Sequence, residues 1–516
     1  MNHDNKTESN NVRANFDICV IGGGINGVGI ARDAAGRGLS TVLLEKGDLG
    51  NATSSMSSKM IHGGLRYLEY YEFGLVRSSL RERNVLLRIA PHIIKPMRFI
   101  LPHEPYLRPA WLIRMGLFFY DFLAVRHKSL KRSTGFKIKK TVYESLLNDS
   151  YKTAFSYADC WVEDSRLVVL NAVDAVKKGA HVRPYNECIS AVRKGGRWLV
   201  TVQNHMTGKE YCITTKMLVN AAGPWVRSVL DDNKLSDDET LNVRLVKGSH
   251  IIVDKLYEGD HAYLLQQPDG RVVFVWPYEG NYSLVGTTEE QYEGDPKEAM
   301  ISNAEIDYLC ASVNRSFKKA ISGDNIVWSY SGVRPLLDDG EEKASAVTRD
   351  YKLVVEDGGA PLLSVFGGKI TTYRKLAEKA VAKIFDVLDE EDKKGKWTHK
   401  EPLPGGNVFN GDFDAFVETQ RKKYRWVPAE MLMRLARSYG TNMDQILQHG
   451  ESLVGLGHHY GDGLYEREVA YMIKQEMARS SEDILWRRSK LGVHVSELTQ
   501  KNLEEALPQL LQEHMG

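Results

Sequence analysis

The sequence is poor in cysteine, and its few cysteines are scattered. The 516 residues include five cysteines, and no two of them form a C-x-x-C pair. This spacing excludes a disulfide framework and a clustered zinc site, and the odd count fits a reducing compartment. No metal is expected to take part in the chemistry.

An excess of charge of either sign is also lacking. Lys and Arg together number 68, Asp and Glu together number 67, and the formal net charge is +1. Such a balance produces no overall field that would attract a polyanion. Nucleic acid is therefore not an expected partner.

Long hydrophobic runs are missing as well. No window reaches the roughly 18 uncharged apolar residues of a membrane-spanning helix, and the nearest approach, residues 111–125, is interrupted by Arg114 and Asp121. Residues 1–15 are polar and lack the apolar core of a secretory signal. We therefore expect a flexible tail over 1–15 and a cytoplasmic protein that does not span the membrane.

The chain does have the composition and length of a multidomain globular protein. Hydrophobic residues make up 42% and charged residues 26%, which are ordinary values, and the length calls for two or three domains. Strand-like runs alternate with helical stretches up to a Pro- and Gly-rich segment at 400–412, beyond which the apolar spacing is helical. The sequence thus predicts a mixed α/β (α+β) region over 16–399 and an all-helical domain over 400–516.

A glycine-rich turn follows the first predicted strand. Gly22, Gly24 and Gly27 form G-x-G-x-x-G between the strand FDICVI and a helix, and the next strand ends at Glu45. The first glycine permits the tight turn, the second lets the backbone approach a pyrophosphate, and the third allows close helix packing. Glu45 can accept hydrogen bonds from ribose hydroxyls. The motif predicts a Rossmann-like dinucleotide site, but it does not separate FAD from NAD.

Two later strands also end in glycine turns, and they favour the longer cofactor, FAD. Gly223 follows the run MLVNAA, and Gly367 and Gly368 follow the run LLSVF and precede a helix. This helix, expected to be capped by Thr371 or Thr372, would direct its positive dipole end toward the anion of a reduced flavin. An NAD-linked enzyme needs only the first of the three turns.

A dense run of hydroxyl side chains follows Glu45 and lies within reach of the same sheet edge. On its own such a run is usually a solvated loop. Beside three glycine turns, it is a candidate to contact the cofactor. The run, with the lysine that closes it, consists of Thr53, Ser54, Ser55, Ser57, Ser58 and Lys59.

Taken together, these segments resemble the aerobic, membrane-associated, FAD-dependent glycerol-3-phosphate dehydrogenases. The likeness rests on SSKMIHGGLRYLE, LVKGSHIIV, YSGVRPL, AVTRDY and SVFGGKITTYRKLAEKA. It implies a Rossmann-like FAD-binding domain built from residues 16–100, 150–240 and 350–390. It also implies a D-amino-acid-oxidase-like substrate domain over residues 241–349 and a helical cap at the C-terminus.

The resemblance also implies the reaction. FAD would accept a hydride at N5 from C2 of sn-glycerol 3-phosphate, giving dihydroxyacetone phosphate, and the electrons would pass to a membrane quinone. The protein would be bound peripherally to the inner face of the cell membrane, and whether it forms a homodimer is left open. The alternatives are an oxygen-using glycerol-3-phosphate oxidase, an amine-oxidising relative, and a flavin-binding membrane scaffold without turnover.

Cationic side chains within the matching motifs are candidates to hold the substrate phosphate. An arginine is suited to this task because its planar fork donates two hydrogen bonds at once to phosphate oxygens. Arg334 is expected to serve both in binding and in catalysis. By resemblance, the substrate contacts are Arg66, Tyr67, Arg334, Arg349 and Lys369.

A histidine can take the proton of the substrate hydroxyl near neutral pH. His250 in KGSHII is the first choice and His62 is the competitor. The alternative for His250 is a hydrogen-bonded strand residue or a flavin contact. The residues expected at the cofactor are Gly22, Gly24, Gly27, Glu45, Thr53, Ser54, Ser55, Ser58, Lys59, His62, Gly223, Gly367, Gly368, Lys369 and Thr371.

One segment, residues 107–132, could lie in a membrane interface. Its aromatic residues would enter the headgroup boundary while the flanking cations meet anionic lipid. A buried amphipathic helix explains the same spacing without lipid. The aromatic residues are Trp111, Phe118, Phe119 and Phe122, and the cations are Arg108, Arg126, Lys128, Lys131 and Arg132.

Overall fold

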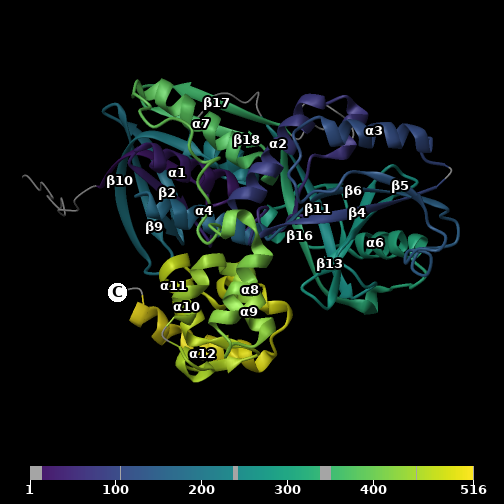
Figure 1. Cartoon of the computed structure of the whole chain (residues 1–516). Helices are drawn as coiled ribbons and strands as arrows, with labels where there is room; N and C mark the ends of the chain where they lie inside the picture. Colours follow the sequence, from purple (N-terminus) through teal and green to yellow (C-terminus); the bar gives the residue numbers. More distant parts are fainter. Residues whose placement is uncertain (1–13, 105, 236–241, 338–349, 449, 515–516) are drawn as a thin grey trace, which may run out of the picture.

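The computed structural model of the chain describes residues 14–104, 106–235, 242–337, 350–448 and 450–514. Within these residues two large sheets lie side by side, and a helical domain formed by the C-terminal residues lies against one side of them (Figure 1). The predicted fold class, a mixed α/β body followed by helices, is confirmed. Strand β1 begins at Ala14, so the last two residues of the predicted tail belong to the first sheet.

The first sheet contains the predicted βαβ unit. Its strand order is β17-β18-β10-β1-β2-β7, with β9 and β8 continuing beside β10, and β18, β10, β1 and β2 run parallel to one another. The turns that follow these four strands therefore share one edge of the sheet. The strands are β1 (Ala14–Ile21), β2 (Thr41–Glu45), β7 (His181–Pro184), β8 (Asn186–Lys194), β9 (Arg197–Asn204), β10 (Lys209–Asn220), β17 (Tyr351–Asp357) and β18 (Pro361–Gly367).

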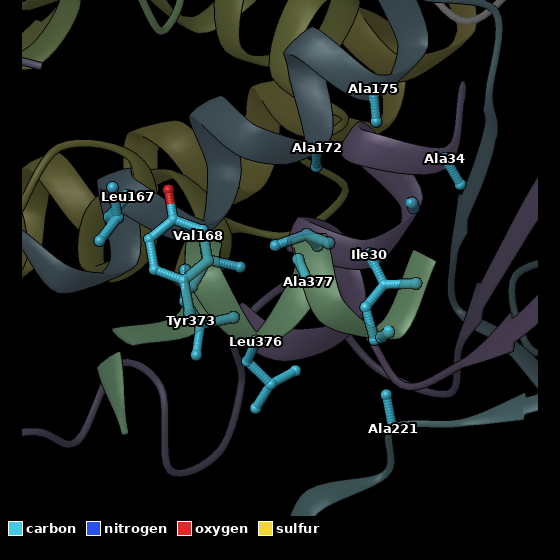
Figure 2. Close-up of a cluster of buried hydrophobic side chains, with 14 of the residues drawn as sticks. Ile30, Ala34, Leu167, Val168, Ala172, Ala175, Ala221, Tyr373, Leu376 and Ala377 are labelled. Atoms are coloured by element: carbon cyan, nitrogen blue, oxygen red, sulfur yellow. The ribbon is translucent and has the colours of Figure 1, made fainter. Parts of the chain in front are cut away.

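Three helices cover one face of this sheet, namely α1 (Ile25–Arg37), α4 (Asp164–Lys177) and α7 (Tyr373–Leu388). Figure 2 shows their shared core, in which Ala34, Ala172 and Ala377 lie among larger side chains. The small residues let the helices approach closely, because a Cβ at Gly29 of α1 would lie 2.9 Å from the Tyr373 ring. The helix α5 (Val226–Asp232) packs on the opposite face with β8 and β9.

The second sheet has the order β15-β11-β14-β13-β12-β4-β6-β3, with β16 beside β11 and β5 beside β6. Helix α6 (Asn303–Ser316) covers one face, while α2 (Phe73–Ile89) and α3 (Ala110–Phe122) pack on the other. The strands are β3 (Met60–Ile61), β4 (Ile94–His103), β5 (Thr134–Lys137), β6 (Thr153–Val162), β11 (Val243–Asp254), β12 (Ala262–Gln266), β13 (Val272–Tyr278), β14 (Tyr282–Gly286), β15 (Glu290–Gln291) and β16 (Ile326–Leu337).

The division between the two sheets differs from the expected one. Strands β3, β4 and β6 were expected within the FAD-binding segments 16–100 and 150–240, yet they belong to the second sheet. Strand β4 pairs in parallel with β12 and antiparallel with β6. A strand's own sequence does not reveal which distant strand it will pair with, so position along the chain was a poor guide here.

The C-terminal residues form a separate hydrophobic core that extends from Val408 to Leu510. The prediction that this region is entirely helical is wrong, because β19 (His459–Gly461) and β20 (Leu464–Tyr465) form a small antiparallel ribbon. The helices are α8 (Phe413–Lys423), α9 (Ala429–Tyr439), α10 (Met443–Leu447), α11 (Glu466–Glu476) and α12 (Glu497–His514).

Short helical turns complete the described structure. They are η1 (Leu65–Tyr70), η2 (Gly223–Trp225), η3 (Pro296–Glu298), η4 (Gly323–Asn325), η5 (Ile370–Thr372), η6 (Phe409–Gly411), η7 (Gly440–Asn442), η8 (Leu453–Leu456), the π-helical η9 (Asp483–Arg488) and η10 (Leu491–Val493). Within the described ranges, no helix is both long enough and apolar enough to cross a membrane.

Buried ion pairs hold the C-terminal domain against the first sheet. Asp48, which lies just beyond β2, is fully buried and accepts hydrogen bonds from Arg487 at 2.5 Å and from Arg488 at 2.6 and 2.7 Å. Arg166 of α4 donates to both carboxylate oxygens of Glu476, at 2.5 and 2.6 Å. Buried charges are costly unless they are paired, so each of these contacts requires both of its domains to be in place.

We expect the replacement Arg488→Met to destabilise the protein, because it leaves the Asp48 carboxylate buried with one cationic partner fewer. Breaking a buried pair from one side typically costs about 3–5 kcal/mol. A urea titration followed by tryptophan fluorescence would show the unfolding transition at lower denaturant. The matched control is Arg421→Met, which breaks the exposed pair with Glu418. Equal midpoints for the two variants would contradict the structural role of Arg488.

Candidate active site

The predicted glycine turns meet at one edge of the first sheet. Gly22 directly follows β1 with φ +108°, and a Cβ there would lie 2.6 Å from the carbonyl oxygen of Ala221, in the turn after β10. The side chain of Asn26 donates to the carbonyl oxygen of Gly367 at 3.3 Å, which joins α1 to the turn after β18. Turns from three parts of the sequence therefore form one continuous main-chain surface.

The first turn of α1 points its backbone amides toward this surface. The N-cap residue Gly24 has no side chain, and the Ser54 hydroxyl accepts a hydrogen bond from the Ile25 amide at 3.0 Å. Gly27 allows the predicted close packing, because a Cβ there would overlap the carbonyl oxygen of Gly22. The amino end of α1, with the positive end of the helix dipole, suits a pyrophosphate.

Glu45 lies at the end of β2 with its carboxylate turned back toward the glycine turn. One oxygen accepts from the Gly23 amide at 2.7 Å and the other accepts from the Gly47 amide at 2.8 Å. Burial raises the pKa of Glu45, and these two hydrogen bonds partly oppose that shift. Each carboxylate oxygen can accept a further hydrogen bond, so the geometry suits the predicted contact with a ribose hydroxyl.

A single cavity of about 1020 Å³ extends over this edge and continues to the second sheet. Its lining includes both the glycine turns and a group of charged side chains. Of the predicted site residues, the cavity is lined by Gly22, Gly24, Glu45, Thr53, Ser54, Ser58, His62, Arg66, Tyr67, Gly223, Arg334, Gly367, Gly368 and Lys369.

Other predicted site residues do not line this cavity. Ser55 and Lys59 border a separate cavity of about 240 Å³, and the buried Lys59 ammonium pairs with Asp164 at 2.8 Å. Lys59 turns away from the main cavity because its ammonium group is buried against Asp164, whereas the neighbouring Ser58 lines that cavity. Arg349 lies outside the described residues.

Thr371 takes part in the site differently from the prediction. Thr372 is the N-cap residue of α7, as predicted, but its side chain makes no capping hydrogen bond. The Thr371 hydroxyl accepts a hydrogen bond from the His62 amide at 3.3 Å. This bond joins the η5 turn to the loop that carries His62.

The two candidate histidines occupy different positions. His250 is fully buried, stacks on Tyr330 with ring centroids 4.7 Å apart, and does not line the cavity. Its Nε2 lies 2.9 Å from the hydroxyl of Ser58, which does line the cavity. Burial holds the pKa of His250 well below its usual value, and Arg334 and Lys59 lower it further.

His62 borders the cavity directly. Burial lowers its pKa to about 3, and the cations Lys369 and Arg83 act in the same direction. The imidazole is therefore neutral at pH 7, with one ring nitrogen unprotonated, which is the state that a general base needs.

The cationic part of the cavity gathers side chains from both sheets. Lys369, which follows β18, lies 4.9 Å from the centroid of the Tyr67 ring, and Arg334 of β16 donates to the Thr287 hydroxyl at 3.2 Å. Arg66 lies on η1 at the same cavity. These groups form a positive region suited to a small dianion.

Sequence reasoning missed two charged residues of this region. Arg271 lines the cavity beside Val272, and Glu289 lies 3.8 Å from Arg66 and 3.9 Å from Arg334. Arg271 directly precedes β13, and Glu289 directly precedes β15. A polar residue next to a strand is usually solvated, so only the pairing of the strands could reveal that these two face inward.

The strand order, the glycine turns and the single cavity that extends from them to the second sheet define a dinucleotide-dependent enzyme. A family model described as FAD dependent oxidoreductase matches residues 17–374, and a model described as the C-terminal domain of alpha-glycerophosphate oxidase matches residues 396–516. The chain belongs to the FAD-dependent oxidoreductase family, and FAD is its cofactor. The main-chain surface, the α1 amides and Glu45 are the groups that would hold it.

Similar proteins cover nearly the whole chain. A glycerol-3-phosphate dehydrogenase of Pseudomonas aeruginosa is 50% identical over 494 residues, which is 95% of this chain and 95% of that protein. A D-erythritol 1-phosphate dehydrogenase of Brucella abortus is 49% identical over 482 residues, 93% of this chain and 95% of that protein. A solved glycerol-3-phosphate dehydrogenase of Bacillus halodurans, complexed with FAD, has a TM-score of 0.76 at 27% identity and covers 97% of this chain and 91% of that one.

Proposed function

We propose that the protein oxidises sn-glycerol 3-phosphate to dihydroxyacetone phosphate and passes the electrons to a membrane quinone. The observation that supports this most directly is the single cavity of about 1020 Å³, which is lined both by the glycine turns proposed to hold FAD and by Arg66, Arg334 and Lys369. A phosphate held by these cations would place the substrate carbons next to the bound cofactor. The names of the similar dehydrogenases agree with a phosphorylated polyol as the substrate.

The chain's own residues orient the substrate and remove its hydroxyl proton. FAD, when bound, supplies the hydride acceptor. Arg66 and Arg334 approach the cavity from different elements, so they can grip phosphate oxygens from two directions and hold the reacting carbon in one place. The cluster of cations disfavours an ammonium group, which argues against an amine substrate.

We propose His62 as the base that accepts this proton. It borders the cavity with a neutral imidazole, whereas His250 reaches the cavity only through the Ser58 hydroxyl. An incoming phosphate opposes the effect of Lys369 and Arg83 on His62, because a nearby anion favours the protonated imidazole. Binding of the substrate therefore strengthens the base that the reaction needs.

A second candidate substrate is D-erythritol 1-phosphate. The similarity to the Brucella abortus enzyme of that name is as high as the similarity to the glycerol-3-phosphate dehydrogenase. Both substrates carry a phosphate on a primary carbon next to a secondary alcohol, so the cation cluster and the base serve them equally. The two differ by the length of the polyol beyond the reacting carbon.

Mixing the anaerobic holoprotein with a panel of alcohols tests the proposed reaction. The flavin absorbance near 450 nm, a general property of oxidised flavins, should bleach with sn-glycerol 3-phosphate and stay unchanged with unphosphorylated glycerol, because the cations bind phosphate. Faster bleaching with D-erythritol 1-phosphate would favour the second candidate. Reduced flavin should then be reoxidised faster by a quinone analogue than by oxygen. A flavin that no phosphorylated polyol reduces would refute the proposal.

The role of His62 is tested by replacing it with Asn. The kcat for sn-glycerol 3-phosphate should fall by about 10²–10⁴-fold, the usual contribution of a general base, while the flavin content is unchanged. Stopped-flow flavin reduction separates this loss from effects on reoxidation. The comparison variants are His250→Asn and Ser58→Ala. If His62→Asn keeps the wild-type rate while these two lose it, the Ser58–His250 pair receives the proton instead.

We also propose that α3 attaches the protein to the membrane surface. Trp111 is 67% exposed and Phe122 is 56% exposed, whereas only Leu117 and Tyr120 of this helix are buried. The exposure of these rings speaks against the alternative of a buried amphipathic helix for this face. Figure 1 shows α3 at the periphery, away from the C-terminal helices. Apolar rings next to cations such as Arg132 are typical of an interfacial helix.

Serine replacements at Trp111, Phe118 and Phe122 should weaken binding to vesicles of phosphatidylglycerol and phosphatidylcholine by at least about tenfold, or ~1.4 kcal/mol. The loss of buried apolar area is the cause. Flavin reduction by the substrate in solution should be unchanged. Serine at the exposed Val454 and Leu498 is the control, and equal vesicle binding by both variants and the wild type would exclude α3 as the contact.

A further inference from the structure

A carboxylate lies within the cluster of cations that is proposed to hold the substrate phosphate. Glu289 reaches Arg66 at 3.8 Å with one oxygen and Arg334 at 3.9 Å with the other. Its side chain is 14% exposed, and it lines the cavity. A negative charge in a site for a dianion is unexpected, because like charges repel strongly in a partly desolvated cavity.

The backbone on both sides of Glu289 is held firmly. On one side, the Thr288 hydroxyl donates to the buried Glu305 carboxylate at 2.6 Å and accepts from the Ser249 amide at 2.9 Å. On the other side, Glu290 pairs with Lys247 in the ladder between β15 and β11. The position of Glu289 at the cavity is therefore imposed by the fold on each side of it.

The ion pairs that Glu289 forms with Arg66 and Arg334 are long for hydrogen bonds. Ion pairs at 3.8 and 3.9 Å attract the guanidinium groups without using their N–H donors in close hydrogen bonds to this carboxylate. A phosphate that approaches Arg66 and Arg334 can form the shorter, charge-assisted bonds. To do so, the phosphate must weaken the attraction of each arginine to Glu289, and it is repelled by the negative charge of that carboxylate.

We propose that Glu289 is an internal competing anion that sets the affinity of the site for phosphate. This inference rests on the proposed function, since it assumes that Arg66 and Arg334 bind the phosphate. Before the substrate binds, Glu289 holds the two guanidinium groups in place. Once the substrate is bound, the repulsion between Glu289 and the phosphate limits the affinity. Substrate and product carry the same phosphate, so a site without this carboxylate would release product slowly and would fill with inorganic phosphate.

The test compares Glu289→Gln with Glu290→Gln in the FAD-loaded protein. Gln is nearly isosteric with Glu, so the first variant removes the charge and keeps the shape. Glu290 is a matched control, because it is the next residue, does not line the cavity and lies 3.4 Å from Lys247. Titration of inorganic phosphate into the oxidised protein, followed by the change in flavin absorbance, gives a dissociation constant without turnover.

For Glu289→Gln we expect the dissociation constant of inorganic phosphate and the KM for sn-glycerol 3-phosphate to fall at least tenfold, by similar factors, with no rise in kcat. Glu290→Gln should stay within twofold of the wild type. An unchanged or weaker affinity for phosphate in Glu289→Gln would overturn the inference. A raised KM with unchanged phosphate affinity would also overturn it, and would assign Glu289 to a substrate hydroxyl.

These results are separable from a failure of the proposed function. If no phosphorylated polyol reduces the wild-type flavin, the proposed reaction is wrong. The phosphate titration still tests Glu289 in that case, because it requires only binding. Tighter phosphate binding in Glu289→Gln would then support the competing anion at a site whose substrate is a different phosphate.

Discussion

The close approach of the main chain to a dinucleotide at one edge of a parallel sheet is the constraint on which the rest of the structure depends. Parallel strands β2, β1, β10 and β18 bring their carboxyl ends together, and a side chain at Gly22 or Gly27 would collide with neighbouring main chain. The alanine-rich contacts of α1 with α4 and α7 follow from the same need, because the helix must lie tightly against the sheet (Figure 2). The cofactor surface is thus made of backbone, and side chains are left to select the substrate.

Charge is arranged differently at the interface with the C-terminal domain and in the cavity between the two sheets. Buried pairs such as Asp48 with Arg488 hold the domains together and are fully satisfied. The cavity, by contrast, gathers Arg66, Arg334 and Lys369 around one carboxylate, Glu289. Neutral histidines complete this region, because burial and the nearby cations both disfavour their charged form. Lys369 and Arg334, which are proposed to bind the phosphate, therefore also lower the pKa of His62 and of His250, respectively.

Local signals in the sequence were sufficient to predict the βαβ unit, the three glycine turns and a set of site residues most of which line the cavity. The three glycine turns lie close together because the strands that precede them run parallel, so that their carboxyl ends share one edge of the sheet. The residues that were misplaced depend on pairing between distant segments. Lys59 turns inward because it pairs with Asp164, a residue 105 positions away in the chain. Glu289 faces the cavity because the adjacent strand β15 pairs with β11. Composition and spacing carry no information about either contact.

A crystal structure of the FAD-loaded protein with bound inorganic phosphate tests the central claim most directly, which is that cofactor and phosphate share one cavity. We predict that the flavin ring lies against the Gly367–Gly368 turn and that the phosphate contacts Arg66 and Arg334 beside it. A phosphate bound elsewhere, or a flavin ring that leaves the cation cluster on a separate surface, would contradict this claim.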